Sequence, residues 1–211
     1  MPKVLSPADI EAFRERLCDI AEEKFAAHGI DGVTLRDLAT AMGVSPMTPY
    51  RYFKDKDAIL AAVRTRAFNR FAEAMEKAEG AMRKKGGGQP GDVYIDWALK
   101  HPAAYRMIFD TNQPTAFDYP DLVAAMKRAK DTMTGGWKIL RDNGRFKGDV
   151  DLAGHLHWSA MHGAVMLELT GLVKKPFDAR AIARRAIVAT RGLERARAAL
   201  QRARDRGRQV G

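Results

Sequence analysis

The sequence has little that would support secretion, membrane insertion or covalent cross-linking. Cys18 is the only cysteine among 211 residues, which excludes an internal disulfide and fits a reducing cytoplasm. No run approaches the roughly 18 consecutive apolar residues that a membrane span needs. The N-terminal segment MPKVLSPADIEAFRERL carries acids where a secretory signal would be apolar. We therefore expect a cytoplasmic protein with no membrane partner.

Motifs for catalysis and metal binding are also missing. The sequence has no Gly-rich phosphate loop, nucleophile elbow or paired acid and base carboxylates. His155 and His157 stand two residues apart on a predicted helix, so their side chains point about 200° apart and cannot share a metal ion. His155 and His162 share a face, but no HExxH motif and no histidine pair four residues apart occurs. We expect no metal site, no cofactor and no enzymatic activity, and a small helical enzyme is the least favoured class.

Sustained alternation of apolar and polar residues, the pattern of a half-buried strand, is absent as well. Hydrophobic residues make up 46% of the chain, which is enough for a proper core. The expected fold class is therefore all-α. Helices are predicted over residues 7–27, 35–42, 45–56, 57–83, 92–100, 103–109, 120–143, 150–172 and 178–205. Residues 84–91, KKGGGQPG, read as a flexible linker, and residues 110–119 as a loop.

The positive charge of the chain is distributed unevenly. The net charge is +10, yet residues 1–60 hold eight lysines and arginines against ten aspartates and glutamates. The excess lies downstream, with ten arginines between residues 178 and 211. These arginines are expected on the solvated face of an amphipathic helix that frays into a disordered tail over residues 206–211, with non-specific attraction to DNA as the alternative. Overall basicity is therefore weak evidence for DNA binding.

The local pattern over residues 34–56, TLRDLATAMGVSPMTPYRYFKDK, is much more informative. Thr34 is a good helix N-cap, and Asp37 completes a capping box. Gly43 ends the helix where a left-handed backbone is needed, and Ser45 is expected to cap the next helix, with Pro46 at its first position. A three-residue turn between two capped helices predicts a helix-turn-helix, whose second helix is presented to the DNA major groove.

The second helix carries side chains suited to DNA. It offers the hydroxyl, phenol and basic groups of Ser45, Thr48, Tyr50, Arg51, Tyr52, Lys54 and Lys56, with one acid, Asp55. Such donors at a helix N-terminus fix a protein on phosphates, and an arginine can pair with a guanine edge. A merely solvated polar face is the alternative, but the combination of caps, turn and aromatic-basic face favours DNA.

The segment GVSPMTPYRYFKDKDAIL resembles the recognition-helix signature of the tetracycline-repressor (TetR) family, and the resemblance extends upstream through FAAHGIDGVTLRDLATAMG. It implies a two-domain, all-helical homodimer. The residues that it implicates in DNA binding are Thr34, Ser45, Met47, Thr48, Tyr50, Tyr52 and Lys56, to which we add Arg51. The family usually has leucine where this chain has Pro49. Because proline lacks an amide and disfavours helical geometry at Thr48, the first turn is predicted to be distorted or of the 3₁₀ type.

The second half of the chain favours dimerisation and ligand binding. The helix over residues 150–172 is apolar nearly all round, and small residues including Gly154 and Gly163 would let a partner helix approach. Its HWSAMHG run resembles the Trp-His-Gly type of regulatory domain found in one branch of the TetR family. The helices over residues 150–172 and 178–205 are therefore the expected homodimer interface, and Gly135 and Gly136 are expected to kink their helix or allow a close approach.

Aromatic and methionine side chains concentrate in this half. Each one alone is more often core, but together they fit an apolar small-molecule pocket. The residues predicted to bind a small apolar or aromatic effector are Trp97, Tyr105, Phe109, Phe117, Met133, Trp137, Trp158 and His162.

The sequence as a whole predicts an N-terminal helix-turn-helix domain over residues 1–56 and a helical ligand-binding and dimerisation bundle over residues 57–205. The function expected is a homodimeric transcriptional repressor that binds a palindromic double-stranded DNA operator and is released by its effector. The alternative is a helical ligand-binding or interaction protein with a degenerate helix-turn-helix.

Overall fold

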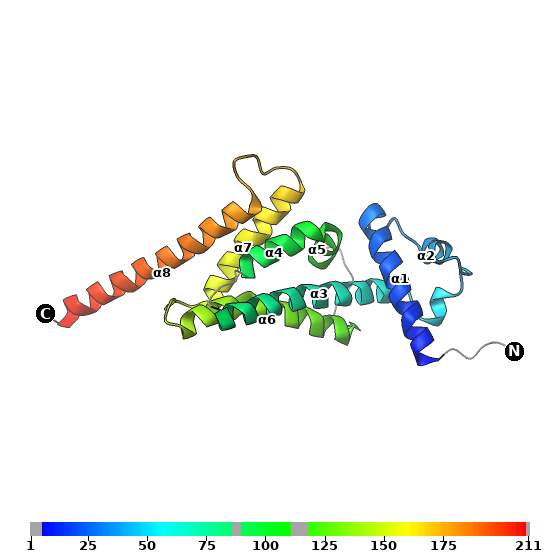
Figure 1. Cartoon of the computed structure of the whole chain (residues 1–211), viewed down its shortest axis with the longest axis horizontal. Helices are drawn as coiled ribbons and strands as arrows, with labels where there is room; N and C mark the ends of the chain where they lie inside the picture. Colours follow the sequence, from blue (N-terminus) through cyan, green and yellow to red (C-terminus); the bar gives the residue numbers. More distant parts are fainter. Residues whose placement is uncertain (1–5, 86–89, 111–117, 210–211) are drawn as a thin grey trace. The chain divides into compact units, whose positions relative to one another are not determined.

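The structure, a computed structural model, describes residues 6–85, 90–110 and 118–209. Every regular element in these ranges is helical, as predicted (Figure 1). The elements in chain order are α1 (Pro7–His28), α2 (Leu35–Met42), the 3₁₀ helix η1 (Pro49–Arg51), α3 (Lys56–Lys85), α4 (Pro90–Lys100), α5 (Pro102–Phe109), α6 (Pro120–Asp142), α7 (Val150–Leu169) and α8 (Ala179–Gln209). Residues 86–89 of the predicted linker and residues 111–117 of the predicted loop lie outside the described residues.

Short polar side chains set the starts of the helices. Asp55 Oδ1 accepts a hydrogen bond of 2.8 Å from the amide of Ala58 at the start of α3. Asp149 Oδ1 accepts from the amides of Asp151 and Leu152 at 2.9 and 3.0 Å at the start of α7. Each carboxylate satisfies amides that have no partner within the first helical turn and lies at the positive end of the helix dipole.

The chain forms two compact units. The first unit comprises residues up to Arg70 together with His101–Arg128, and the second comprises Phe71–Lys100 together with the residues from Ala129 onward. Helices α3 and α6 each contribute residues to both units. The functional division at residue 56 stays a prediction. Helix α8 runs on through residues 206–209, which the sequence assigned to a disordered tail, because no proline interrupts it and a single glycine is tolerated in a helix.

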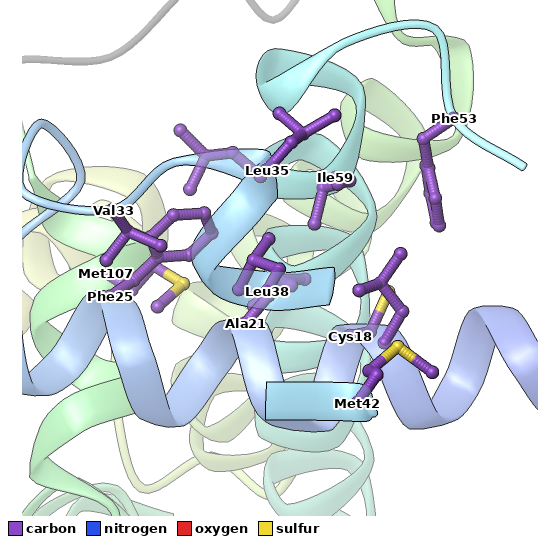
Figure 2. Close-up of a cluster of buried hydrophobic side chains, with 13 residues drawn as sticks. Cys18, Ala21, Phe25, Val33, Leu35, Leu38, Met42, Phe53, Ile59 and Met107 are labelled. Carbon is purple, nitrogen blue, oxygen red and sulfur yellow. The ribbon is translucent and has the colours of Figure 1, made fainter. Parts of the chain in front are cut away.

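An apolar core joins the helices of the first unit. Figure 2 shows side chains from α1, α2, α3 and α5 converging on one cluster. Leu38 lies at the inner face of α2 and is fully buried. The cluster comprises Leu17, Cys18, Ala21, Phe25, Val33, Leu35, Leu38, Met42, Phe53, Ile59, Leu60, Val63 and Met107. Cys18 is buried in this cluster, and burial raises the pKa of its thiol.

The second unit is built around α7, which packs chiefly against α8 and also contacts α4. Gly135 permits a close approach, because a Cβ there would overlap the carboxylate of Glu79. Burial raises the pKa of Glu79 to about 7. Gly154 faces Thr134 of α6 within the same chain, whereas a Cβ on Gly163 would meet open space. Of the two glycines expected to admit a partner helix, only Gly163 is therefore open.

The burial of Leu38 makes a direct prediction for stability. Leu38→Ala should lower the free energy of unfolding by about 2–5 kcal/mol, because it removes a fully buried side chain and leaves a cavity. Chemical denaturation followed by circular dichroism measures this loss. Ile10→Ala on α1 is the control, since Ile10 is 40% exposed and its truncation should cost about 1 kcal/mol or less. Equal losses for the two variants would contradict the assigned packing of α2.

Candidate nucleic-acid interface and ligand cavity

The capping box predicted at the start of α2 is present. The Thr34 hydroxyl accepts from the Asp37 amide at 3.2 Å, and the Thr34 amide donates to Asp37 Oδ2 at 2.9 Å. These hydrogen bonds lower the pKa of Asp37 below its usual value. Gly43 adopts the left-handed conformation, with φ 70° and ψ 31°, and so ends α2 as predicted. The Thr34 hydroxyl is also hydrogen-bonded to Asp37 Oδ2 at 2.6 Å, which makes it a structural cap whatever else it contacts.

Residues 45–53, which we call the recognition segment, form a tight 3₁₀ turn at their centre instead of a long α-helix. The Ser45 carbonyl accepts from the Thr48 amide at 2.9 Å, and the Thr48 carbonyl accepts from the Arg51 amide at 3.1 Å. In an α-helix the Ser45 carbonyl would accept from residue 49, but Pro49 has no amide hydrogen. The bond therefore shifts to the residue before, which is the 3₁₀ pattern. The predicted 3₁₀ turn is confirmed, and a continuous helix over residues 45–56 is wrong.

The cap expected from Ser45 is also wrong. Its hydroxyl lies 2.9 Å from the Thr48 hydroxyl, and Thr48, the residue before η1, makes no side-chain cap either. The Thr48 amide is already satisfied by the Ser45 carbonyl, so no amide is left for the Ser45 hydroxyl at this position.

The 3₁₀ geometry sorts the side chains of the recognition segment into rows. With about three residues per turn, side chains three apart lie one above the other. Met47 and Tyr50 form one row, and their side chains are 67% and 51% exposed. Thr48 and Arg51 form the second row, in which Arg51 is exposed. The third row turns inward, with Pro49 fully buried. Two rows of polar, aromatic and sulfur-containing groups are thus available to a partner.

Tyr52, three residues after Pro49 in the inner row, and the neighbouring Phe53 contact α1. The sequence did not reveal these contacts. The Tyr52 ring stacks on Phe13, with centroids 3.9 Å apart and an interplanar angle of 20°. The Tyr52 carbonyl accepts from Arg14 Nη1 at 2.7 Å, and the same guanidinium lies over the Phe53 ring at 4.2 Å. These partners are nearly 40 residues apart in sequence, so no local pattern indicates them. Tyr52 has a structural role in positioning the segment.

Lys56 is held in a similar way. Its amine donates to the carbonyl of Ile30 at 3.0 Å, and its side chain is half-buried at the start of α3. Lys54, two residues earlier, is exposed. Direct DNA contacts by Lys56 and Tyr52 stay predictions, because both groups already make intramolecular contacts in this structure.

A cavity of about 300 Å³ lies within the second unit, bounded by α3, α4, α6, α7 and α8. Its apolar wall includes Phe71, Met75, Met82, Met133, Trp137, Trp158 and Met161. Of the eight predicted ligand residues, Met133, Trp137 and Trp158 line it. Cavities of this size and lining bind small, mostly apolar molecules.

The other predicted ligand residues do not line this cavity. Tyr105 and Phe109 belong to the first unit, where Tyr105 is fully buried and their rings lie 4.8 Å apart. Trp97 is buried edge-on against Phe71 at 5.2 Å. His162 is adjacent to Trp158, with ring centroids 6.0 Å apart, but is not among the lining residues. Trp97 and Tyr105 are buried in the core, whereas Phe109 and His162 are half-buried. Phe117 lies outside the described residues.

His157 also lines the cavity, although the sequence did not predict it as a ligand contact. It is 8% exposed, its ring meets Trp137 edge-on at 5.9 Å, and it hydrogen-bonds to the Ala183 backbone. Burial, with the positive charge of Arg191, lowers the pKa of His157 to about 4. The ring is therefore neutral at physiological pH. Its place in the cavity follows from the packing of α7 against α4 and α8.

Two sequence models of known families match this chain. The model described as "Bacterial regulatory proteins, tetR family" matches residues 17–63, and the model described as "Tetracyclin repressor-like, C-terminal domain" matches residues 89–190. The chain belongs to the TetR family. It is accordingly a DNA-binding transcriptional regulator with a TetR-type C-terminal domain, as the resemblance in the recognition segment implied. The Trp-His-Gly subtype of that domain stays a prediction.

Individual relatives agree with this assignment. An uncharacterized HTH-type transcriptional regulator of Mycobacterium tuberculosis is 26% identical over 171 residues, covering 81% of this chain and 75% of the relative. A solved protein of unknown function from Rhodococcus sp. RHA1 has a TM-score of 0.73 at 23% identity, over 92% of this chain and 99% of that one. SmeT, the repressor of the Stenotrophomonas maltophilia multidrug efflux pump SmeDEF, has a TM-score of 0.60 at 21% identity, over 86% and 90%. The two structures show the same fold.

Neither a metal-binding cluster nor a membrane-spanning helix occurs among the residues that the structure describes. Nowhere in ranges 6–85, 90–110 and 118–209 do three or more His, Cys, Asp or Glu side chains form a group that could hold a metal ion. None of the helices in the same ranges combines the length and apolar character needed to cross a membrane.

The missing amide at Pro49 makes a prediction for the recognition segment. Pro49→Leu restores an amide that can donate to the Ser45 carbonyl, so the segment should change from 3₁₀ toward α-helical geometry. Carbon-13 secondary chemical shifts over residues 46–52 measure the change. Pro46→Ala is the matched control, since Pro46 is exposed and its carbonyl and ring take no part in the Ser45–Thr48 bond. Unchanged shifts in Pro49→Leu would show that the missing amide does not set this geometry.

Proposed function

We propose that this TetR-family protein is a homodimeric repressor that binds a palindromic operator and is released by a small apolar or aromatic effector in the cavity of the second unit. Residues 1–56 would form the DNA-binding domain and residues 57–205 the regulatory domain. The observation that carries the proposal is the recognition segment, which turns two rows of side chains outward directly after a capped α2.

The outward rows supply the chemistry for DNA. Thr48 and Arg51 offer a hydroxyl and a guanidinium to phosphates or to a guanine edge, and Tyr50 offers a phenol. Met47 adds an apolar surface that can contact a thymine methyl group. Two copies of such a segment, related by a two-fold axis, would read two half-sites about one helical turn apart or a multiple of it.

The surface of α7 and α8 supports dimerisation. Leu152, Leu156 and Leu167 recur on one face of α7 and are 43%, 47% and 46% exposed. Gly163 lies on the same face and has open space above it. On α8, Val188 is 69% exposed. Apolar side chains in such number at helical spacing favour burial against a second helix pair.

Helix α3 supplies the proposed route from effector to DNA. It begins directly after the recognition segment and lines the cavity with Phe71, Met75 and Met82. An effector that favours one position of this wall would bias the position of the same helix at its other end. In a dimer this would change the spacing of the two recognition segments and weaken operator binding.

Arg51 provides the test of DNA docking. Arg51→Ala should weaken binding to DNA selected by the wild-type protein from a random library by about ten-fold or more, since a bidentate arginine contact is worth about 1–3 kcal/mol. Fluorescence anisotropy at fixed salt measures the affinity. Arg106→Ala, at an exposed arginine on α5, is the charge-matched control and should bind within about two-fold of wild type. If Arg51→Ala binds normally, this docking mode is wrong, and a wild-type protein that selects no sequence would favour the ligand-binding alternative.

Val188 provides the test of the dimer. Val188→Glu would place a charge in the proposed apolar interface, so sedimentation at micromolar concentration should show a monomer in place of the wild-type dimer. Val123→Glu is the matched control, because Val123 is a 38% exposed residue of α6 in the first unit. A dimer that survives Val188→Glu, or one that is lost equally in Val123→Glu, would place the interface elsewhere.

A further inference from the structure

The charged side chains that line the second-unit cavity already have interactions in the structure or are exposed. Arg184 and Asp92 pair with each other, with 2.8 Å between Arg184 Nη2 and Asp92 Oδ2. Arg191 lies over the Trp137 ring, with 6.0 Å from Cζ to the ring centroid, and takes part in a further interaction. Arg145 is exposed. Selection of a ligand inside the cavity therefore depends on the uncharged polar groups of the lining.

The His157 ring is enclosed by residues of three other helices at the cavity wall. It is 8% exposed and meets Trp137 of α6 edge-on at 5.9 Å. It hydrogen-bonds to the backbone of Ala183 on α8. On the side of α4, a Cβ on Gly91 would lie 3.1 Å from His157 Cε1 and 3.4 Å from Nε2, so the glycine leaves room beside this edge of the ring. Because His157 and Gly91 both line the cavity, this edge is within reach of a bound molecule.

The hydrogen bond to Ala183 determines what the His157 ring can offer to a ligand. This hydrogen bond raises the pKa of His157, against the larger lowering by burial and by the charge of Arg191. A carbonyl that accepts from a ring N–H has this effect, whereas a backbone amide that donates to the ring would lower the pKa. The resulting pKa of about 4 leaves the ring neutral at physiological pH, with one N–H and one lone-pair nitrogen. Since the N–H donates to Ala183, the second nitrogen is an acceptor.

Thr132 on α6 adds a second acceptor to the lining. Its hydroxyl donates to the carbonyl of Ala129 at 2.7 Å, so its proton is engaged while its oxygen keeps a lone pair. Tyr94 and Trp158, which also line the cavity, already take part in other interactions. The two lining groups whose hydrogen-bonding roles are fixed in this way, His157 and Thr132, are both acceptors.

From this arrangement we propose that the effector is an uncharged apolar molecule with a hydrogen-bond donor, of the alkylphenol or indole type, which donates to the acceptor nitrogen of His157. The inference rests on the proposed function for the existence of an effector, and adds its chemical class. Trp137, Met133 and Met161 would contact the hydrocarbon part. A molecule of similar shape without the donor would bury this nitrogen without a hydrogen bond, which is more costly in an apolar cavity than at an exposed surface.

Matched pairs of small molecules test the proposal without any variant. The probes are 4-propylphenol and indole, paired with the methylated forms 4-propylanisole and 1-methylindole, which lack the donor. Isothermal titration calorimetry at pH 7.5, where all four are uncharged, measures binding. At least one donor should bind about ten-fold or more tightly than its methylated form. Equal binding within both pairs, tighter binding of the methylated forms, or no binding of any of the four at millimolar concentration overturns the proposal.

Variants then assign the preference to one side chain. His157→Phe keeps an aromatic ring but removes the acceptor, so the ratio of donor to methylated affinity should fall about ten-fold. The steric effect of the added methyl group cancels, because both proteins receive the same pair. His155→Phe is the matched control, since His155 is an exposed histidine of the same helix and is not among the lining residues. It should keep the wild-type ratio, and an undiminished ratio in His157→Phe contradicts the assignment.

The ring nitrogens of wild-type His157 give a readout that does not depend on the folding of a variant. In a long-range proton–nitrogen NMR spectrum of the histidine side chains, the unprotonated nitrogen of His157 should move upfield when 4-propylphenol is added, because it then accepts a hydrogen bond. 4-Propylanisole should move it much less. A bound phenol that leaves this resonance in place contradicts the proposed contact.

DNA release is measured separately, by adding the preferred donor to the complex of protein and selected DNA. A donor that binds with the expected preference but leaves DNA affinity unchanged supports the ligand class and contradicts the proposed release mechanism. A methylated form that releases DNA as well as its donor does supports release and contradicts the ligand class.

Discussion

The outward side chains of the recognition segment are positioned by the contacts that its inward side makes with α1. Tyr52 stacks on Phe13, Arg14 donates to the Tyr52 carbonyl and lies over the Phe53 ring, and Pro49 is fully buried. With that row fixed, the missing amide at Pro49 forces the tighter 3₁₀ turn. The outward positions of Met47, Tyr50 and Arg51 follow from these two constraints. Tyr52 and Lys56, two residues that the family resemblance implicates in DNA binding, therefore also hold the motif in place through intramolecular contacts.

The second unit combines two properties that a regulatory domain needs. Its cavity is apolar over most of the wall, with a neutral His157 and a guanidinium over Trp137 at one side. Its outer face on α7 carries exposed leucines beside the open Gly163. Helix α7 thus contributes one face to the cavity and another to the proposed dimer, so occupancy of the cavity and packing of the dimer can influence each other.

Local chemistry was predictable from the sequence, whereas partners distant in sequence were not. The cap at Thr34 and the 3₁₀ turn at Pro49 depend on residues within four positions, and the structure confirms them. The cavity-lining residues were harder to predict, because an aromatic side chain has the same sequence signature in a core as in a cavity. Tyr105 fell in the core, and His157 reached the cavity through packing of α7 on α4 and α8. The Tyr52–Phe13 stack had no local signal at all.

The most direct test of the central claim is a TROSY NMR titration of isotope-labelled protein with its selected DNA, reading which backbone amides shift. Our account predicts the largest shifts at Met47, Thr48, Tyr50 and Arg51, with smaller ones at the N-terminus of α2. The competing source of DNA affinity is the arginine-rich α8. Shifts concentrated on α8, with the recognition segment unchanged, would contradict the account.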